Sequence, residues 1–192
     1  MLVLKKNLLT LGLLLLSVTI LGGCSSNQAS SNQTQTTTKS ESLVDSTKVS
    51  LKSAISLYQK TYPDSDITSI ELDKTVGKPV YEIEGVDDNK EYKLSINAKN
   101  KKILRKKTEN LDDDEQNGQA RKDDKVKLDK LLSLNKITKI AEKKLKNSQA
   151  KEFSLEQELG VTYWEVNVKH GSKEKEVKIN AITGKILNTE ND

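Results

Sequence analysis

The sequence has little of the residue types on which many kinds of functional site depend. Its 192 residues include one cysteine, one histidine and two prolines, and aromatic residues make up 4%. A single cysteine excludes an internal disulfide, so the core alone must hold the fold together. The zinc patterns HExxH and CxxC are missing, as are GxSxG and glycine-rich phosphate loops. We therefore expect no catalytic residues, no cofactor site, no metal site and no enzyme activity.

The N-terminus has the features of an export signal. Lys5 and Lys6 precede a mostly apolar stretch over 8–21, which is shorter than the roughly 20 apolar residues of a membrane-spanning helix. It ends in Leu21-Gly22-Gly23-Cys24, which resembles the lipobox of bacterial lipoproteins. The resemblance implies that 1–23 is a signal peptide and that Cys24 carries diacylglycerol. We therefore predict a cell-membrane lipoprotein on the extracytoplasmic face; the high lysine content favours a Gram-positive envelope.

Charge does not favour a nucleic-acid partner. Removing 1–23 takes away two of the 32 basic residues and no acid, which leaves 30 (32 − 2) against 28. The lysines alternate with acids, and the only arginines are Arg105 and Arg121. A surface that binds nucleic acid needs a basic patch instead.

The segment that follows Cys24 is rich in Ser, Thr, Gln and Asn. Such a composition cannot bury enough apolar surface to offset chain entropy, so we predict a flexible tether over 24–47. As a random coil of about twenty residues it would span roughly 25 Å.

An internal repeat organises the rest of the chain. A shift of 83 residues aligns two segments without a gap, and apolar residues coincide at nearly every core-like position. For example, Val80-Tyr81-Glu82-Ile83 aligns with Tyr163-Trp164-Glu165-Val166, and Ile96-Asn97-Ala98 aligns with Ile179-Asn180-Ala181. We therefore predict domains over 48–106 and 131–189 with a charged linker over 107–130.

Each copy is predicted to begin with an amphipathic helix. Leu51, Ile55, Tyr58 and Tyr62 share one helical face behind a capping Ser50. In the second copy Leu134, Ile137, Ala141 and Leu145 form such a face behind Ser133. Alternating apolar and polar residues follow in both copies, as in Tyr92-Lys93-Leu94-Ser95-Ile96. The fold class is therefore α+β, with two tandem copies of a helix followed by a three- to four-stranded antiparallel sheet. One sheet face should be covered by the helix and the other solvated.

The strand motifs resemble the PepSY domain family. That pattern has a valine-tyrosine-glutamate-valine strand and a later strand that ends in aspartate-alanine-x-threonine-glycine-lysine. The second copy has Asn180-Ala181-Ile182-Thr183-Gly184-Lys185, with asparagine in place of aspartate. The first copy has Asn100-Lys101 in place of the threonine-glycine pair. Because asparagine tolerates a left-handed turn, we expect this hairpin to be kept.

The resemblance implies a binding role outside the cell. Members of the family occur in propeptides of secreted metallopeptidases and in envelope lipoproteins, where they are thought to inhibit or regulate peptidases. The leading hypothesis is a non-enzymatic lipoprotein that regulates a peptidase or another envelope protein through a sheet edge or the open sheet face. The alternative is a sensor or accessory lipoprotein that binds a small ligand or cell-wall component for a membrane signalling or transport system. A metal-dependent enzyme with unrecognised carboxylates is a third, less favoured hypothesis.

Individual residues add little to these hypotheses. His170 is predicted to be a solvated turn residue, and Asp112-Asp113-Asp114-Glu115 a solvated acidic segment, because it lacks the alternating spacing of a calcium loop. Tyr81 and Trp164 could form a binding surface, but the alternation favours the core.

Overall fold

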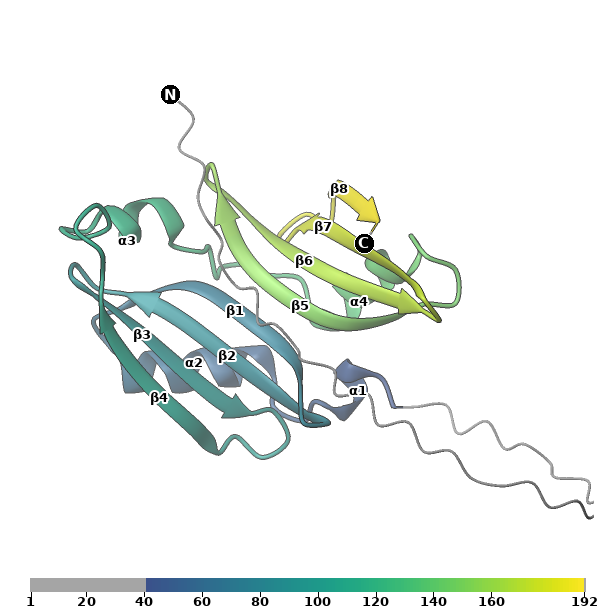
Figure 1. The fold of residues 1–192 in the computed structure, drawn as a ribbon, viewed down its shortest axis with the longest axis horizontal. Coiled ribbons are helices and arrows are strands. Elements are labelled where there is room, and N and C mark those ends of the chain that lie inside the picture. Colours follow the sequence, from purple (N-terminus) through teal and green to yellow (C-terminus); the bar gives the residue numbers. More distant parts are fainter. Residues whose placement is uncertain (1–40, 192) are drawn as a thin grey trace, which may run out of the picture. The chain divides into compact units, whose positions relative to one another are not determined.

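The computed structural model describes residues 41–191. The order of elements is helix α1 (Leu43–Ser46), helix α2 (Leu51–Thr61), four strands, helices α3 (Gln119–Asp124) and α4 (Leu134–Glu142), and four more strands (Figure 1). The first four strands are β1 (Asp66–Thr75), β2 (Lys78–Val86), β3 (Lys90–Asn97) and β4 (Ile103–Asn110). The last four are β5 (Gln149–Glu158), β6 (Val161–His170), β7 (Lys173–Asn180) and β8 (Ile186–Asn191).

All eight strands belong to one antiparallel sheet in the order β4-β3-β2-β1-β5-β6-β7-β8. The prediction of two copies of a helix with antiparallel strands is confirmed, but the prediction of two separate small sheets is wrong. Each copy supplies four strands, and β1 pairs with β5 to join them. A free β1 or β5 would expose a row of unpaired backbone groups, so pairing them removes two sheet edges.

The β1–β5 ladder is symmetric about one pair of residues. Ile70 pairs with Leu155, Leu72 pairs with Phe153, and Glu71 faces Ser154 between them. Because Phe153 is the repeat equivalent of Ile70 and Leu155 that of Leu72, each strand presents the same repeat positions to the other copy. This is the self-complementary pattern of a twofold dimer interface, here within one chain.

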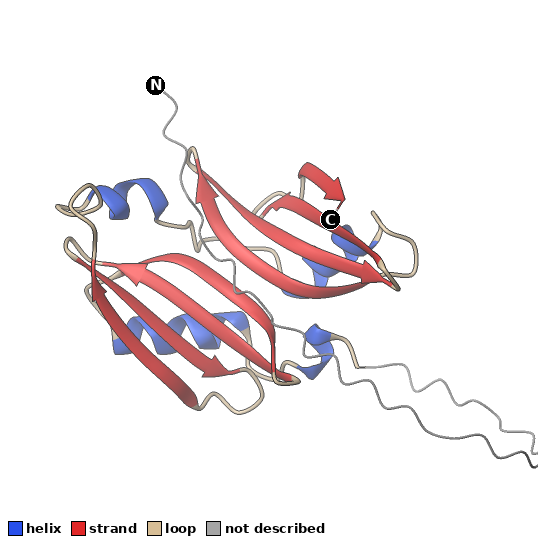
Figure 2. Cartoon of the chain, in the orientation of Figure 1, coloured by secondary structure: helices blue, strands red, loops and turns tan. Residues whose placement is uncertain are grey.

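The helices α2 and α4 cover the same kind of face in each copy (Figure 2). Ser50 and Ser133 cap them by accepting hydrogen bonds from the backbone N–H groups of Ser53 and Lys136. The alternating strand residues beneath form one core cluster across both copies, with Tyr81, Ile83, Trp164 and Val166 fully buried. On the opposite sheet face, which we call the open face, no helix of residues 41–191 covers the centre (Figure 2).

The segments outside the two copies are more ordered than the sequence indicates. Residues Leu43–Ser46, at the end of the predicted tether, form α1, and Leu43 is buried. Strand β4 continues to Asn110, inside the predicted linker, and the linker then packs on the sheet through Leu111, Ala120 and Val126. Its isolated apolar residues gave no helical or strand period, so their burial was not predicted.

Two local expectations need correction. The β3–β4 hairpin is kept, but Lys101 (φ 65°), not Asn100, takes the left-handed conformation, at the position of Gly184 (φ 76°) in the second copy. The side chain of Asn97 stabilises this turn by accepting hydrogen bonds from the backbone N–H groups of Lys99 and Asn100. Helix α4 ends at Glu142, so Leu145 lies beyond it, although it still packs against the core.

Candidate functional site

The structure assigns ordinary positions to most residues that the sequence singled out. Cys24 lies outside the described residues, so its lipidation stays a prediction. His170 is exposed at the end of β6, and Asp112–Glu115 are exposed before α3. Tyr81 and Trp164 are fully buried, which confirms that they belong to the core. Across residues 41–191, no cluster of three or more His, Cys, Asp or Glu residues is arranged to hold a metal ion.

The open face is the most unusual surface of the sheet because carboxylates from both copies are concentrated on it. The ladder registers place acidic residues of β1, β2, β3, β5, β6 and β7 on this face, opposite the core residues of the same strands. They are Glu71, Asp73, Glu82, Glu84, Glu91, Glu152, Glu156, Glu165, Glu174 and Glu176.

The carboxylates perturb one another. Burial and then the neighbouring Glu84 and Glu82 raise the pKa of Glu71 from 4.5 to about 7. Burial and then Glu176 raise the pKa of Glu165 to about 7 as well. The pKa values of Asp73, Glu91 and Glu152 are also raised, with burial as the largest cause. Burial and the close spacing of the carboxylates therefore both oppose ionisation on this face.

Lysines on the open face offset the negative charge only of the carboxylates next to them. In the first copy, Lys93 forms ion pairs with Glu82 (3.1 Å) and Glu84. Burial lowers the pKa of Lys93, but these two carboxylates outweigh it and hold the pKa above its usual value. In the second copy, Lys178 lies 4.1 Å from the centre of the Tyr163 ring and 3.4 Å from Glu158.

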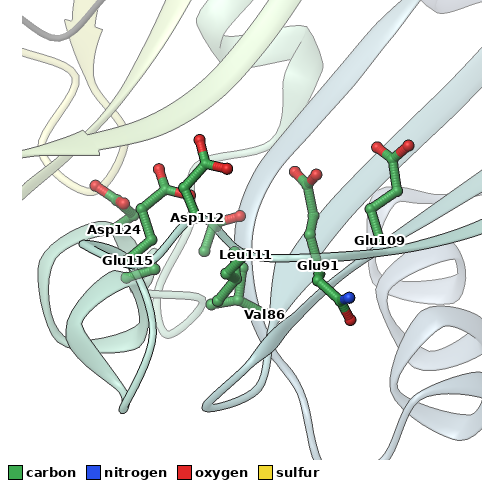
Figure 3. A pocket seen from close by; sticks show the side chains of 10 residues that line it. Val86, Glu91, Glu109, Leu111, Asp112, Glu115 and Asp124 are labelled. Atoms are coloured by element: carbon green, nitrogen blue, oxygen red, sulfur yellow. The ribbon is translucent and has the colours of Figure 1, made fainter.

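A groove of about 480 Å³ lies at the end of the open face, between strands β2–β4 and the linker (Figure 3). Its apolar part consists of Val86, Leu111 and Ala120, which form a small cluster apart from the main core. Carboxylates from the strands and from the linker surround this cluster. They are Glu91, Glu109, Asp112, Glu115 and Asp124.

Arg121 holds the linker side of the groove in place. Its guanidinium lies 3.0 Å from Asp66 on β1 and 3.0 Å from Asp88 in the β2–β3 turn. The backbone N–H of Leu111 also donates to Asn89 O (2.9 Å). Sequence reasoning did not predict the groove, because Arg121 is 55 residues from Asp66 and no motif joins them.

The β1–β2 and β5–β6 turns share a second unusual feature. Their central residues are Val76-Gly77 and Leu159-Gly160, with φ values of 49° and 73° and of 49° and 78°. Two-residue hairpin turns with positive φ at both positions normally have Asn or Gly at the first. Here the first residue is a large apolar one, and Val76 and Leu159 are 95% and 96% exposed. Such a strained valine is a genuine outlier.

The family comparison agrees with the fold. The model for the PepSY family, described as "Peptidase propeptide and YPEB domain", matches residues 48–107 and again 131–190. The chain belongs to the PepSY family. Each match contains one helix, three strands and the first part of the fourth, so the joined sheet is built from two PepSY domains.

A solved structure extends this result. The PepSY chain is similar to a crystal structure described as a "putative lipoprotein" from Clostridium difficile 630, with 36% identity and a TM-score of 0.73. The match covers 76% of this chain and 95% of the other. No curated protein matches. Neither comparison points to catalysis. Within 41–191 no helix has the length and apolar character needed to cross a membrane. A non-enzymatic extracytoplasmic lipoprotein fits the family match and the similar solved structure.

Proposed function

We propose that this PepSY protein is anchored through lipid on Cys24 to the outer face of the cell membrane, where it regulates or inhibits a peptidase or another envelope protein. The acidic open face of the joined sheet is the binding surface. It takes a partner with a lysine- or arginine-rich surface.

The charge of the open face carries this proposal. The carboxylates of both copies lie on one continuous sheet, and none of the helices that the structure describes covers the centre of that face (Figure 2). Burial, and after it repulsion from neighbouring carboxylates, raises the pKa values of Glu71 and Glu165 to about 7. A cationic partner would relieve the repulsive part of these shifts. Binding would therefore favour the ionised carboxylates and weaken as the pH falls below 7.

Crosslinking on intact cells, followed by peptidase assays, tests the proposal. A photocrosslinker is placed at Ser154, which faces Glu71 at the centre of the open face, and at Lys136 on α4 as a control. We expect a partner to be captured from Ser154 and not from Lys136. Adding the purified chain to the captured partner, or to secreted metallopeptidases, should change the rate of peptide cleavage. No capture and no rate change would contradict the proposal.

Charge variants identify the surface. Glu82 and Glu165 are repeat equivalents on the open face, so Glu82→Gln together with Glu165→Gln removes one charge from each copy. Asp64→Asn together with Asp129→Asn removes the same charge from exposed loop positions. We expect only the first pair to weaken capture; equal weakening would mean that net charge alone decides binding.

The groove favours a second candidate, a sensor or accessory lipoprotein for a small ligand. Its apolar cluster of Val86, Leu111 and Ala120 within a ring of carboxylates suits a small organic cation. Adding amines of increasing apolar size and recording the chemical shift of Ala120 would test this. Shifts that saturate, with no effect of Glu165→Gln, would favour the groove over the open face.

A further inference from the structure

The Val76 turn lies at an end of the sheet that is rich in exposed lysines. Lys74 and Lys78 flank the turn in the β1–β2 hairpin. The β3–β4 hairpin lies beside it, because the backbone N–H of Ala98 donates to Pro79 O (2.9 Å). This second hairpin adds three exposed lysines. They are Lys99, Lys101 and Lys102.

The residues before α2 belong to the same end. The backbone N–H groups of Lys48 and Val49 both donate to Ala98 O (2.9 and 2.8 Å), so exposed Lys48 lies next to the β3–β4 turn. The nearby acids include Glu41, Asp45 and the half-buried Asp73, which lies within range of Glu82 and Glu152 on the open face. This lysine-rich surface, which we call the Val76 end, therefore carries a positive excess with an exposed apolar side chain at its tip.

The described chain also begins at the Val76 end. The Lys74 ammonium donates to the backbone oxygen of Glu41 (3.1 Å), the first described residue. Glu41 comes only 17 positions (41 − 24) after Cys24, so even a fully extended connection spans no more than about 60 Å. A lipid on Cys24 would hold this end close to a bilayer and give it a high effective concentration there.

We propose that the Val76 end docks on an anionic lipid bilayer, with Val76 at the headgroup boundary and the surrounding lysines on the lipid headgroups. Each lysine near an anionic surface adds to the attraction, and a single exposed apolar side chain adds a small apolar contact. Docking would fix the orientation of the sheet above the membrane and turn the open face toward a partner at a defined height. The inference rests on the proposed lipid anchor for proximity.

The Leu159 turn provides a matched control within the same chain. It has the same backbone conformation and exposure as the Val76 turn. Because β5 is antiparallel to β1, the Leu159 turn lies at the opposite end of the ladder. Glu158 precedes it, and the Lys127 ammonium beside it donates to Gly160 O (2.8 Å). Its surroundings are therefore of mixed charge.

The test uses the full lipidated protein in vesicles. The Val76→Cys and Leu159→Cys variants are labelled with an environment-sensitive fluorophore, since acylation blocks the thiol of Cys24. Spin-labelled lipids then report contact in phosphatidylglycerol and in phosphatidylcholine vesicles. We expect quenching at position 76 in phosphatidylglycerol alone, and its loss in 1 M salt, where the screening length is about 3 Å. Position 159 should not be quenched.

Charge reversal sharpens the result. Lys74→Glu with Lys78→Glu should reduce quenching at position 76 by about tenfold or more, whereas Lys122→Glu with Lys136→Glu, at exposed sites elsewhere, should leave it unchanged. No quenching at position 76, or equal quenching at 76 and 159, would overturn the inference. The intact mass reports the anchor separately. If the protein is acylated but the label at position 76 is not quenched, docking is refuted and the anchor is not. If the protein carries no acyl group but the label is still quenched when the protein is added to vesicles, the anchor is refuted and docking is not.

Discussion

The two PepSY copies fill the space between helix and sheet with side chains of opposite size. In the first copy, Tyr58 on α2 is fully buried over Gly85 of β2. The repeat equivalents in the second copy are Ala141 on α4 and Val168 of β6, both fully buried. A large helix residue over glycine therefore exchanges with a small helix residue over valine, and the core stays filled. The copies share a backbone, but their cores are not interchangeable position by position.

The copies also differ at the pseudo-twofold centre of the sheet. Glu71 of the first copy faces Ser154, its own repeat equivalent. Two glutamates at this position would repel each other directly on an already acidic face. The joined sheet therefore needs at least this one difference between the copies.

Gly85→Val should have the largest effect on stability. A Cβ at Gly85 would lie 2.4 Å from Asp66 O and 2.5 Å from the Tyr58 hydroxyl. We expect a loss of about 3 kcal/mol in the free energy of unfolding, measured by urea denaturation. Adding Tyr58→Ala, which recreates the pair of the second copy, should recover part of the loss because it removes one of the two clashes. No recovery would show that the backbone contact alone decides the site.

The reverse exchange, Val168→Gly, should cost about 2 kcal/mol. It leaves a cavity beside Ala141 and adds backbone freedom to β6. The same urea experiment measures it, and Val161→Gly in the exposed start of β6 is the control for the backbone term alone. A loss no larger than that of the control would contradict the packing comparison.

Glu71→Gln should raise the free energy of unfolding at pH 8, because it removes a carboxylate whose ionised form is disfavoured in the folded state. We expect a gain of about 1 kcal/mol, which is less than the full linkage value because the side chain is partly solvated. The pKa of about 7 exceeds the usual 4.5, so the folded state binds more protons than the unfolded state between these values. Stability from this group is therefore lost as the pH rises from 5 to 8. Glu165→Gln should behave alike. A steeper profile in either glutamine variant would contradict the sign.

Val76→Asn and Leu159→Asn should each raise the free energy of unfolding slightly, by about 0.5–1 kcal/mol, because asparagine adopts the left-handed conformation more readily. Thermal unfolding in solution should show equal gains for the two turns. A loss of stability at either turn would mean that its apolar side chain has a packing role in the isolated protein.

The sequence predicted much of the fold because its signals are local. Ser50 and Ser133 cap the helices as expected, and the period of two around Tyr81 and Trp164 assigned the core face. The pairing of β1 with β5 could not be predicted, since any unpaired edge could serve and the 83-residue repeat describes each copy separately. The groove depends on contacts of Arg121 with Asp66 and Asp88, and long-range contacts of single charged residues leave no periodic pattern.

The open face could be predicted only in part. Alternation placed Glu82 and Lys93 on the solvated side, but the clustering of carboxylates from six strands emerges only when the two sheets join. The perturbation of Glu71 by Glu152 across the junction is therefore a property of the whole sheet.

The most direct test of the central claim is calorimetric titration of the lipidated protein with the partner captured from Ser154, comparing the two charge-variant pairs. We predict that Glu82→Gln with Glu165→Gln weakens binding by about tenfold, that Asp64→Asn with Asp129→Asn leaves it unchanged, and that the wild-type affinity falls between pH 8 and pH 6. Equal affinity in all three proteins, with no change over this pH range, would contradict the claim that the acidic open face binds the partner.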